Sequence, residues 1–197
     1  MTVLETLAVL FGFVGVWLTV REDWRCWPVG LVSVLSFAVV FWRARLYAAA
    51  ALQVVYAGTQ LYGWWAWRHG GEGDSALRVT RTPRRVLGAL LVAGAVAAVF
   101  LAAGLRRFTD EALPVADAAT TSFSLVAQVL TTRKWVENWP IWIVVDAVYV
   151  AMYFSQSLLP TAALYAAFLG LAVAGWRRWG RSMAEASRRT PDGRSPA

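Results

Sequence analysis

Long apolar runs constrain this chain more than any other feature. Seven stretches are apolar and long enough to cross a membrane, because a hydrocarbon core of about 30 Å takes roughly 20 helical residues. Each must be a helix, since lipid cannot satisfy free backbone amides, and the runs lack the period of two that barrel strands show. The predicted spans are Val3 to Val20, Cys26 to Trp42, Leu46 to Trp67, Val86 to Leu105, Pro114 to Thr132, Trp139 to Phe154 and Pro160 to Trp179.

The basic residues predict how these spans are oriented. The chain of 197 residues is 58% hydrophobic and 16% charged, as in a multi-pass membrane protein. Its net charge of +7 does not indicate nucleic-acid binding, because the basic residues lie at the ends of the spans. With seven spans, 15 of the 19 Lys and Arg residues fall on the side of the C-terminus. The positive-inside rule then predicts an inner (plasma) membrane protein with a cytoplasmic C-terminus and an external N-terminus.

An internal repeat divides the chain into similar halves. Residues 16–68 align without a gap on residues 128–180 at a constant offset of 112, with 14 identities in 53 positions. The informative identities involve Trp, Pro and Gly, since both halves are rich in Ala, Val and Leu. Three spans reverse the direction of a chain, so a fourth is needed to bring in a second triplet with the same orientation. We therefore predict an all-α, 3+1+3 membrane fold of two parallel three-helix repeats, as in some transporters.

The expected boundaries follow from this plan. A seven-helix domain covers residues 1–182, with repeat one at about 3–67, a linker helix at about 86–105 and repeat two at about 114–179. Residues 183–197 are poor in apolar side chains and are expected to form a disordered cytoplasmic tail. Trp24, Trp27, Trp67, Trp176 and Trp179 are interpreted as anchors at the membrane interface, and the matched Gly58 and Gly170 as sites of close helix packing.

Polar and aromatic residues recur at helical spacing in three spans. Such residues are costly in lipid and usually face a cavity or another helix. The third span carries Gln53, Tyr56, Gln60 and Trp64, the fifth carries Thr121, Ser124 and Gln128 below Asp117, and the sixth carries Asn138, Trp142, Asp146 and Tyr149. Three converging stripes predict a wet cavity lined by aromatic rings. The alternative is that these hydroxyls and amides bond to their own backbone or bridge helices.

The chemistry of the stripes suggests a type of ligand. Gln and Tyr donate and accept hydrogen bonds, which suits hydroxyl groups. Trp and Tyr stack on flat rings and attract cations, and a buried carboxylate offsets positive charge. A flat, aromatic, cationic ligand bearing a sugar satisfies all three. Asp146 is the candidate counter-charge, although it can equally hold neighbouring helices together.

Two segments resemble the PnuC family of vitamin transporters. The run from Leu52-Gln53 through Tyr56 to Leu61-Tyr62-Gly63-Trp64-Trp65 is similar to the third-helix signature of that family. The more specific segment is Arg133-Lys134-Trp135-Val136-Glu137-Asn138-Trp139-Pro140-Ile141-Trp142-Ile143, continuing to Asp146 and Tyr149. The resemblance covers nearly the whole chain.

Membership would imply a nicotinamide riboside transporter of the SWEET-like fold that works by facilitated diffusion, often as a trimer. A separate cytoplasmic kinase would then phosphorylate and trap the small-molecule substrate. On this resemblance Gln53, Tyr56, Asn138 and Trp142 are the best ligand contacts. Relatives with similar signatures carry thiamine or riboflavin, so these vitamins stay open as substrates, as does a sugar. Coupling of transport to an ion gradient also stays open.

An enzyme is the alternative from another class. Catalysis within a membrane needs a nucleophile with its base, a pair of carboxylates or a metal cage. The chain has one histidine and one cysteine, His69 and Cys26, and no HExxH, GxSxG or glycine-rich phosphate motif. The sequence therefore favours a transporter that needs no cofactor.

Overall fold

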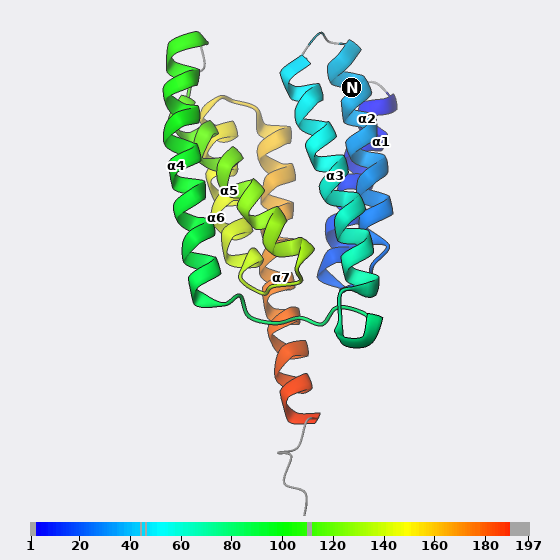
Figure 1. The fold of residues 1–197 in the computed structure, drawn as a ribbon. Helices are drawn as coiled ribbons and strands as arrows, with labels where there is room; N and C mark the ends of the chain where they lie inside the picture. The colour runs from blue at the N-terminus through cyan, green and yellow to red at the C-terminus, as the bar shows by residue number, and fades with distance from the viewer. Residues whose placement is uncertain (1–2, 44, 46, 110–111, 190–197) are drawn as a thin grey trace, which may run out of the picture.

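Seven α-helices make up most of the described chain in a computed structural model (Figure 1). The structure describes residues 3–43, 45, 47–109 and 112–189. The helices are α1 (Val3–Val20), α2 (Cys26–Arg43), α3 (Tyr47–His69), α4 (Arg84–Phe108), α5 (Pro114–Thr132), α6 (Asn138–Ser155) and α7 (Leu159–Arg189), with a 3₁₀ turn, η1 (Glu72–Asp74), between α3 and α4. The prediction of an all-helical fold is confirmed for the described residues.

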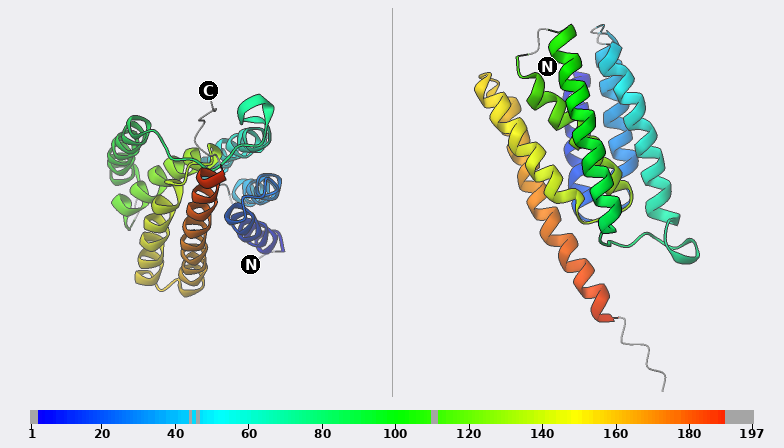
Figure 2. Two further views of the ribbon diagram at one scale, coloured as in Figure 1. Left: turned by 90° about the horizontal axis from the view of Figure 1, so that it is seen from below. Right: turned by 60° about the vertical axis from the view of Figure 1, so that its left-hand side comes forward.

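The helices form two groups that lie side by side (Figures 1 and 2). In the first group α2 packs against α1 and α3, and in the second α6 packs against α5 and α7. Helix α4 packs on α5 at the far edge of the second group. The groups meet where α1 contacts α7 and where α3 contacts α5.

The repeat of the sequence reappears in the positions of the helices. The offset of 112 carries α2 onto α6 over its full length and carries the start of α3 onto the start of α7. The same offset relates α1 to α5 and α3 to α7. The contact between α1 and α7 therefore corresponds to the contact between α5 and α3. The groups therefore meet through equivalent surfaces. The matched helix ends are Cys26 and Asn138, Arg43 and Ser155, Val20 and Thr132, and Tyr47 and Leu159.

The outward faces of the helices carry large apolar side chains. On α4, Val99 and Phe100 are 68% and 74% exposed, and Val54 on α3 is 70% exposed. An exposed apolar surface of this extent suits lipid rather than water. Among the described residues, three helices qualify individually as membrane spans by length and hydropathy: Cys26–Arg43, Arg84–Phe108 and the Leu159–Ala186 part of α7.

Helix α7 is longer than the sequence predicted. It continues without a break to Arg189, well beyond the bundle (Figure 1), so the expectation of a disordered tail from residue 183 is wrong for residues 183–189. The reason is local, because Met183, Ala184, Glu185 and Ala186 are good helix formers and the next proline, Pro191, comes later. Residues 190–197 of the expected tail lie outside the described residues.

The α3–α4 connection, residues 70–83, crosses from one group to the other and is named the strap here (Figure 1). Thr80 pairs through its backbone with the α5–α6 turn, its N–H donating to the Lys134 carbonyl at 3.2 Å and its carbonyl accepting from the Val136 N–H at 3.0 Å. The Thr82 N–H and hydroxyl both donate to Glu137 Oε2, at 2.8 and 2.7 Å. Lys134, Val136 and Glu137, which belong to the segment that carries the family resemblance, therefore bind the strap.

An ion pair joins the two groups beside the strap. Glu22 in the α1–α2 turn and Lys134 in the α5–α6 turn occupy matched positions of the repeat, and both have a left-handed backbone, with φ of 60° and 55°. Lys134 Nζ lies 3.5 Å from Glu22 Oε2 and donates to the Leu77 carbonyl at 3.1 Å. Burial lowers the pKa of Lys134, and Glu22 raises it in part. Two equivalent turns are thus joined by opposite charges.

Candidate functional site

A cavity of about 280 Å³ lies between the two helix groups. Three helices from each group line it, and α4 does not contribute. Its volume is close to the lower end of the range for ligand pockets, about 300–1,000 Å³. The lining includes Gly15, Thr19, Gly30, Val34 and Gln60 from the first group, and Gln128, Thr131, Trp142, Asp146, Tyr165 and Phe168 from the second.

Trp27 and Trp139 line one end of the cavity and pack with Trp67 and Trp179 in a cluster of four tryptophans, called the floor here. They are at most 2% exposed and lie toward the end of the bundle that carries the α1–α2 turn, the strap and the α5–α6 turn, called the basic end here. Trp27 packs edge to face on Trp67, with ring centroids 5.4 Å apart. The matched pair, Trp139 and Trp179, has the same geometry at 5.2 Å, and Trp67 contacts Trp179 at 5.7 Å.

The hydrogen bonds of the floor are also repeated between the two halves. Trp67 Nε1 donates to the Thr131 carbonyl at 3.0 Å, and Trp179 Nε1 donates to the Thr19 carbonyl at 3.1 Å. Thr19 and Thr131 are themselves matched at the offset of 112. Each bond crosses from one helix group to the other, so the floor ties the groups together with a duplicated contact.

One wall of the cavity combines a carboxylate with an indole. Asp146 and Trp142 lie one turn apart on α6 and both line the cavity. The Trp142 Nε1 donates to Thr131 Oγ1 at 3.4 Å, which sets the orientation of the ring. Asp146 is 6% exposed, and no described cation forms an ion pair with it. A buried carboxylate without a partner is costly, and a cationic ligand would remove that cost.

A series of aromatic rings leads from the cavity away from the floor. Tyr165 lines the cavity, and its ring centroid lies 4.5 Å from that of Tyr149 and 5.3 Å from that of Tyr153. On its other side Tyr165 contacts Phe168, which also lines the cavity, at 5.9 Å. These rings offer stacking faces for a flat ligand between the cavity and the far end of the bundle.

Two amides also line the cavity, one from each helix group. Gln60 on α3 of the first group lies against Gly30 on α2. Gln128 on α5 of the second group reaches across to α3, where its Nε2 donates to Thr59 Oγ1 at 3.3 Å. The lining therefore combines two amides with a carboxylate and aromatic rings.

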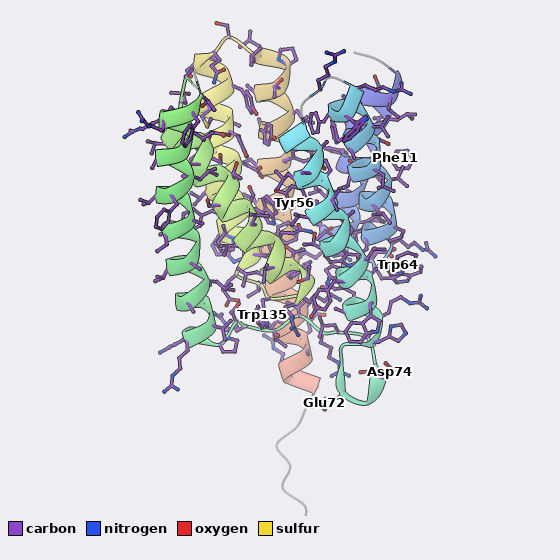
Figure 3. All side chains as sticks on the ribbon, turned by 45° about the horizontal axis from the view of Figure 1, so that its top comes forward. Phe11, Tyr56, Trp64, Glu72, Asp74 and Trp135 are labelled. Carbon is purple, nitrogen blue, oxygen red and sulfur yellow. The ribbon has the colours of Figure 1, made fainter. Side chains whose placement is uncertain are left out.

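The structure brings together most of the residues that the stripes predicted. Gln60, Gln128, Trp142 and Asp146 line the cavity. Next to it, away from the floor, the Tyr149 side chain lies within reach of the hydroxyls of Thr121 and Ser124 and close to Tyr56. Figure 3 shows Tyr56 on α3 between the two helix groups.

The other three predicted residues lie apart from the cavity lining. Trp64 stacks on Trp24 with centroids 6.2 Å apart, at the edge of the first group (Figure 3). Asn138 is fully buried at the start of α6, where its Nδ2 donates to the Trp135 carbonyl at 2.6 Å. Gln53 lies two helical turns from Gln60, toward the far end.

Sequence reasoning missed Tyr165 and Phe168 as lining residues, because α7 shows no polar stripe. It also missed Thr19 and Thr131, although both are identities of the repeat.

Two interpretations of the repeat's identities are wrong. Trp27, Trp67 and Trp179 are buried core residues, because they pack on one another between the helix groups. Gly58 and Gly170 do not permit close packing, since a Cβ at either would meet nothing within 4 Å. Gly63 and Gly175 do, because a Cβ there would overlap with the rings of Trp27 and Trp139.

The described residues offer no site for a metal. They contain no group of three or more His, Cys, Asp or Glu side chains placed to hold an ion. The amides, carboxylate and aromatic rings that line the cavity can bind, neutralise and stack on a ligand.

Comparisons with known proteins agree with this picture. Residues 2–181 match the family described as nicotinamide mononucleotide transporter. The chain is 26% identical to the nicotinamide riboside transporter PnuC of Escherichia coli, over 92% of this chain and 87% of that protein. It is 28% identical to the riboflavin/roseoflavin transporter RibM of Streptomyces davaonensis, over 86% of this chain and 81% of that protein.

A solved structure shares the fold. The crystal structure of the vitamin B3 transporter PnuC superposes on this chain with a TM-score of 0.72 at 24% identity, over 92% of this chain and 82% of that chain. This likeness supports the helix arrangement independently of the sequence comparisons.

Proposed function

The chain belongs to the nicotinamide mononucleotide transporter family, and from that premise we propose that it carries nicotinamide riboside across a membrane through the cavity between its two helix groups. A protein of this family is a transporter rather than an enzyme. Nicotinamide riboside joins a flat, positively charged pyridinium ring to a ribose. Relatives described as nicotinamide riboside transporters, from Escherichia coli and Shigella flexneri, are similar to this chain over 92% of its length.

The observation that carries the substrate proposal is the unpaired carboxylate of Asp146. It lies one turn from Trp142 on the cavity wall, so that one helix presents a negative charge and a stacking surface together. A pyridinium satisfies both, and the ribose suits the amides of Gln60 and Gln128. Riboflavin, the substrate in the name of one relative, is larger and uncharged, so it gains nothing from Asp146.

The membrane topology is part of the proposal. All seven helices cross the bilayer in a 3+1+3 order, with α4 linking two parallel repeats. The matched helix ends and the exchanged contacts α1 with α7 and α3 with α5 support this plan. The basic end carries most Lys and Arg residues and therefore faces the cytoplasm, whereas the N-terminus lies outside.

Transport then requires the floor to open. The four tryptophans and the Glu22–Lys134 pair close the basic end, so release into the cytoplasm needs the two groups to separate there. Rocking of two repeats about a central site provides such a motion. Transport is by facilitated diffusion, a separate kinase traps the product in the cytoplasm, and the chain assembles as a homo-oligomer.

Uptake into liposomes that contain the purified protein tests this function. Labelled nicotinamide riboside should equilibrate across the membrane, and riboflavin and thiamine should enter much more slowly. Collapsing sodium and proton gradients should leave the plateau unchanged. Faster uptake of riboflavin would transfer the assignment to that vitamin, and no uptake of any of the three would reject it.

A further inference from the structure

The two halves of the cavity exchange a large and a small residue at matched positions. Gly30 on α2 corresponds to Trp142 on α6, and Gln60 on α3 corresponds to Ala172 on α7 at the offset of 112. All four line the cavity. In the first half the second helix carries the small residue, Gly30, and the third carries the larger one, Gln60. In the second half the second helix carries the larger residue, Trp142, and the third carries the small one, Ala172. The repeat thus presents an amide from one side and an indole from the other.

The amide occupies the space that the glycine leaves. A Cβ on Gly30 would lie 2.9 Å from both Nε2 and Oε1 of Gln60 and 3.0 Å from its Cδ. These distances are shorter than a normal van der Waals contact, so any side chain at position 30 displaces the Gln60 amide. Gly30 has an ordinary helical backbone, and its absent side chain is therefore its contribution to the site.

The Gln60 amide is available to a ligand. Among the residues that the structure describes, none hydrogen-bonds to its side chain, whereas the Gln128 amide on the same cavity is bound to Thr59. A primary amide carries two donors and one acceptor and can bind a hydroxyl or carboxamide group that both donates and accepts. In a binding site, such a hydrogen bond discriminates between ligands that have the group and ligands that lack it.

We propose that Gly30 is a specificity-determining positioning residue, which holds the Gln60 amide in the cavity wall so that it hydrogen-bonds to a hydroxyl or carboxamide group of the substrate. This inference rests on the proposed function, because it takes the cavity as the substrate site. It assigns the two sides of the cavity separate tasks. The α6 side holds the flat cation, and the Gly30–Gln60 pair selects its polar substituents.

The test uses the variants Gly30→Ala, Gln60→Ala and the double variant in the liposome assay with nicotinamide riboside. Gly30→Ala and Gln60→Ala should each raise KM at least fivefold with little change in maximal rate. The double variant should be no worse than the poorer single variant, since both changes remove the same hydrogen bond. Losses that multiply in the double variant would overturn the proposal.

Gly58→Ala is the matched control, because Gly58 lies on the same helix as Gln60, does not line the cavity, and a Cβ there meets nothing within 4 Å. Its KM should stay within twofold of the unmodified chain. Equal effects of Gly30→Ala and Gly58→Ala would reject the role of Gly30. If Gly30→Ala fails to fold, Gln60→Ala decides alone, and a KM change below twofold would refute the proposal. Failure of the unmodified protein to transport would instead reject the proposed function.

Discussion

The floor of the cavity and its walls use one repeat in two different ways. In the floor, matched residues have matched roles: Trp27 and Trp139 pack over Gly63 and Gly175, and each pair makes the same contact in its own half. In the walls, matched positions carry different chemistry. Asp146 corresponds to Val34, and Trp142 corresponds to Gly30.

The difference reflects what each region binds. The floor is where two copies of one helix group meet, so a residue that packs well in one copy also packs well in the other. The cavity binds a ligand that has no such symmetry, and its two sides must differ. At these positions the identical residues pack where the groups meet, and the residues that differ, such as Asp146 for Val34, lie in the cavity walls.

The largest expected effect comes from breaking the floor. Gly63→Ala and Gly175→Ala should each destabilise the protein by about 1–3 kcal/mol or prevent folding, because the new methyl group overlaps with a buried indole. Thermal unfolding of the detergent-purified variants measures this. Gly58→Ala and Gly170→Ala, where a Cβ has free space, should leave Tm unchanged or raise it. A lower Tm for only one of Gly63→Ala and Gly175→Ala would show that the two halves of the floor are not equivalent.

Asp146→Asn tests the asymmetry of the walls. Affinity for nicotinamide riboside should fall about fivefold or more, since a favourable charge interaction in a partly buried site is worth at least about 1 kcal/mol and often several. The reduced, uncharged form of nicotinamide riboside should lose little affinity. Val34→Thr, at the matched position, should change the two affinities alike. Similar losses for both ligands with Asp146→Asn would mean that Asp146 has a structural role.

A charge exchange probes the ion pair between the matched turns. Lys134→Glu alone should lower the free energy of unfolding by about 1–3 kcal/mol, between the values for exposed and for buried pairs, because two acids would then face each other. Adding Glu22→Lys should recover part of the loss, since the turns are equivalent but the Lys134 bond to Leu77 and its contact with the Trp67 ring are missing. Chemical denaturation of all three variants measures the recovery, and an additive double variant would argue against a direct pair.

The smallest effect concerns the strap, which has no counterpart in the other half. Thr82→Val removes a hydroxyl that donates to Glu137 and should destabilise the protein by about 1 kcal/mol. Thr80→Val is the control, because Thr80 bonds to Lys134 and Val136 through its backbone N–H and carbonyl, and valine preserves both bonds. Equal Tm values for the two variants would exclude a contribution from the Thr82 hydroxyl.

Local patterns allowed much of the architecture to be predicted. The apolar runs gave all seven helices, most to within three residues, because a run of that length in lipid has only one way to pair its amides. The stripes gave Gln60, Gln128, Trp142 and Asp146, since polar side chains at helical spacing share one face. Trp64 and Asn138 follow the same spacing but lie outside the lining, because a stripe does not show where along its length a cavity begins.

The sequence by itself determined that the chain is a helical membrane protein built from a repeat, because hydrophobic length and periodicity are properties of local segments. Only the tertiary structure decided which of the repeated residues meet. It placed three tryptophans in the core rather than at the interface, joined Glu22 to Lys134, and brought the Gln60 amide against Gly30. These contacts link residues tens of positions apart, and they depend on how the two helix groups pack, which no local pattern specifies.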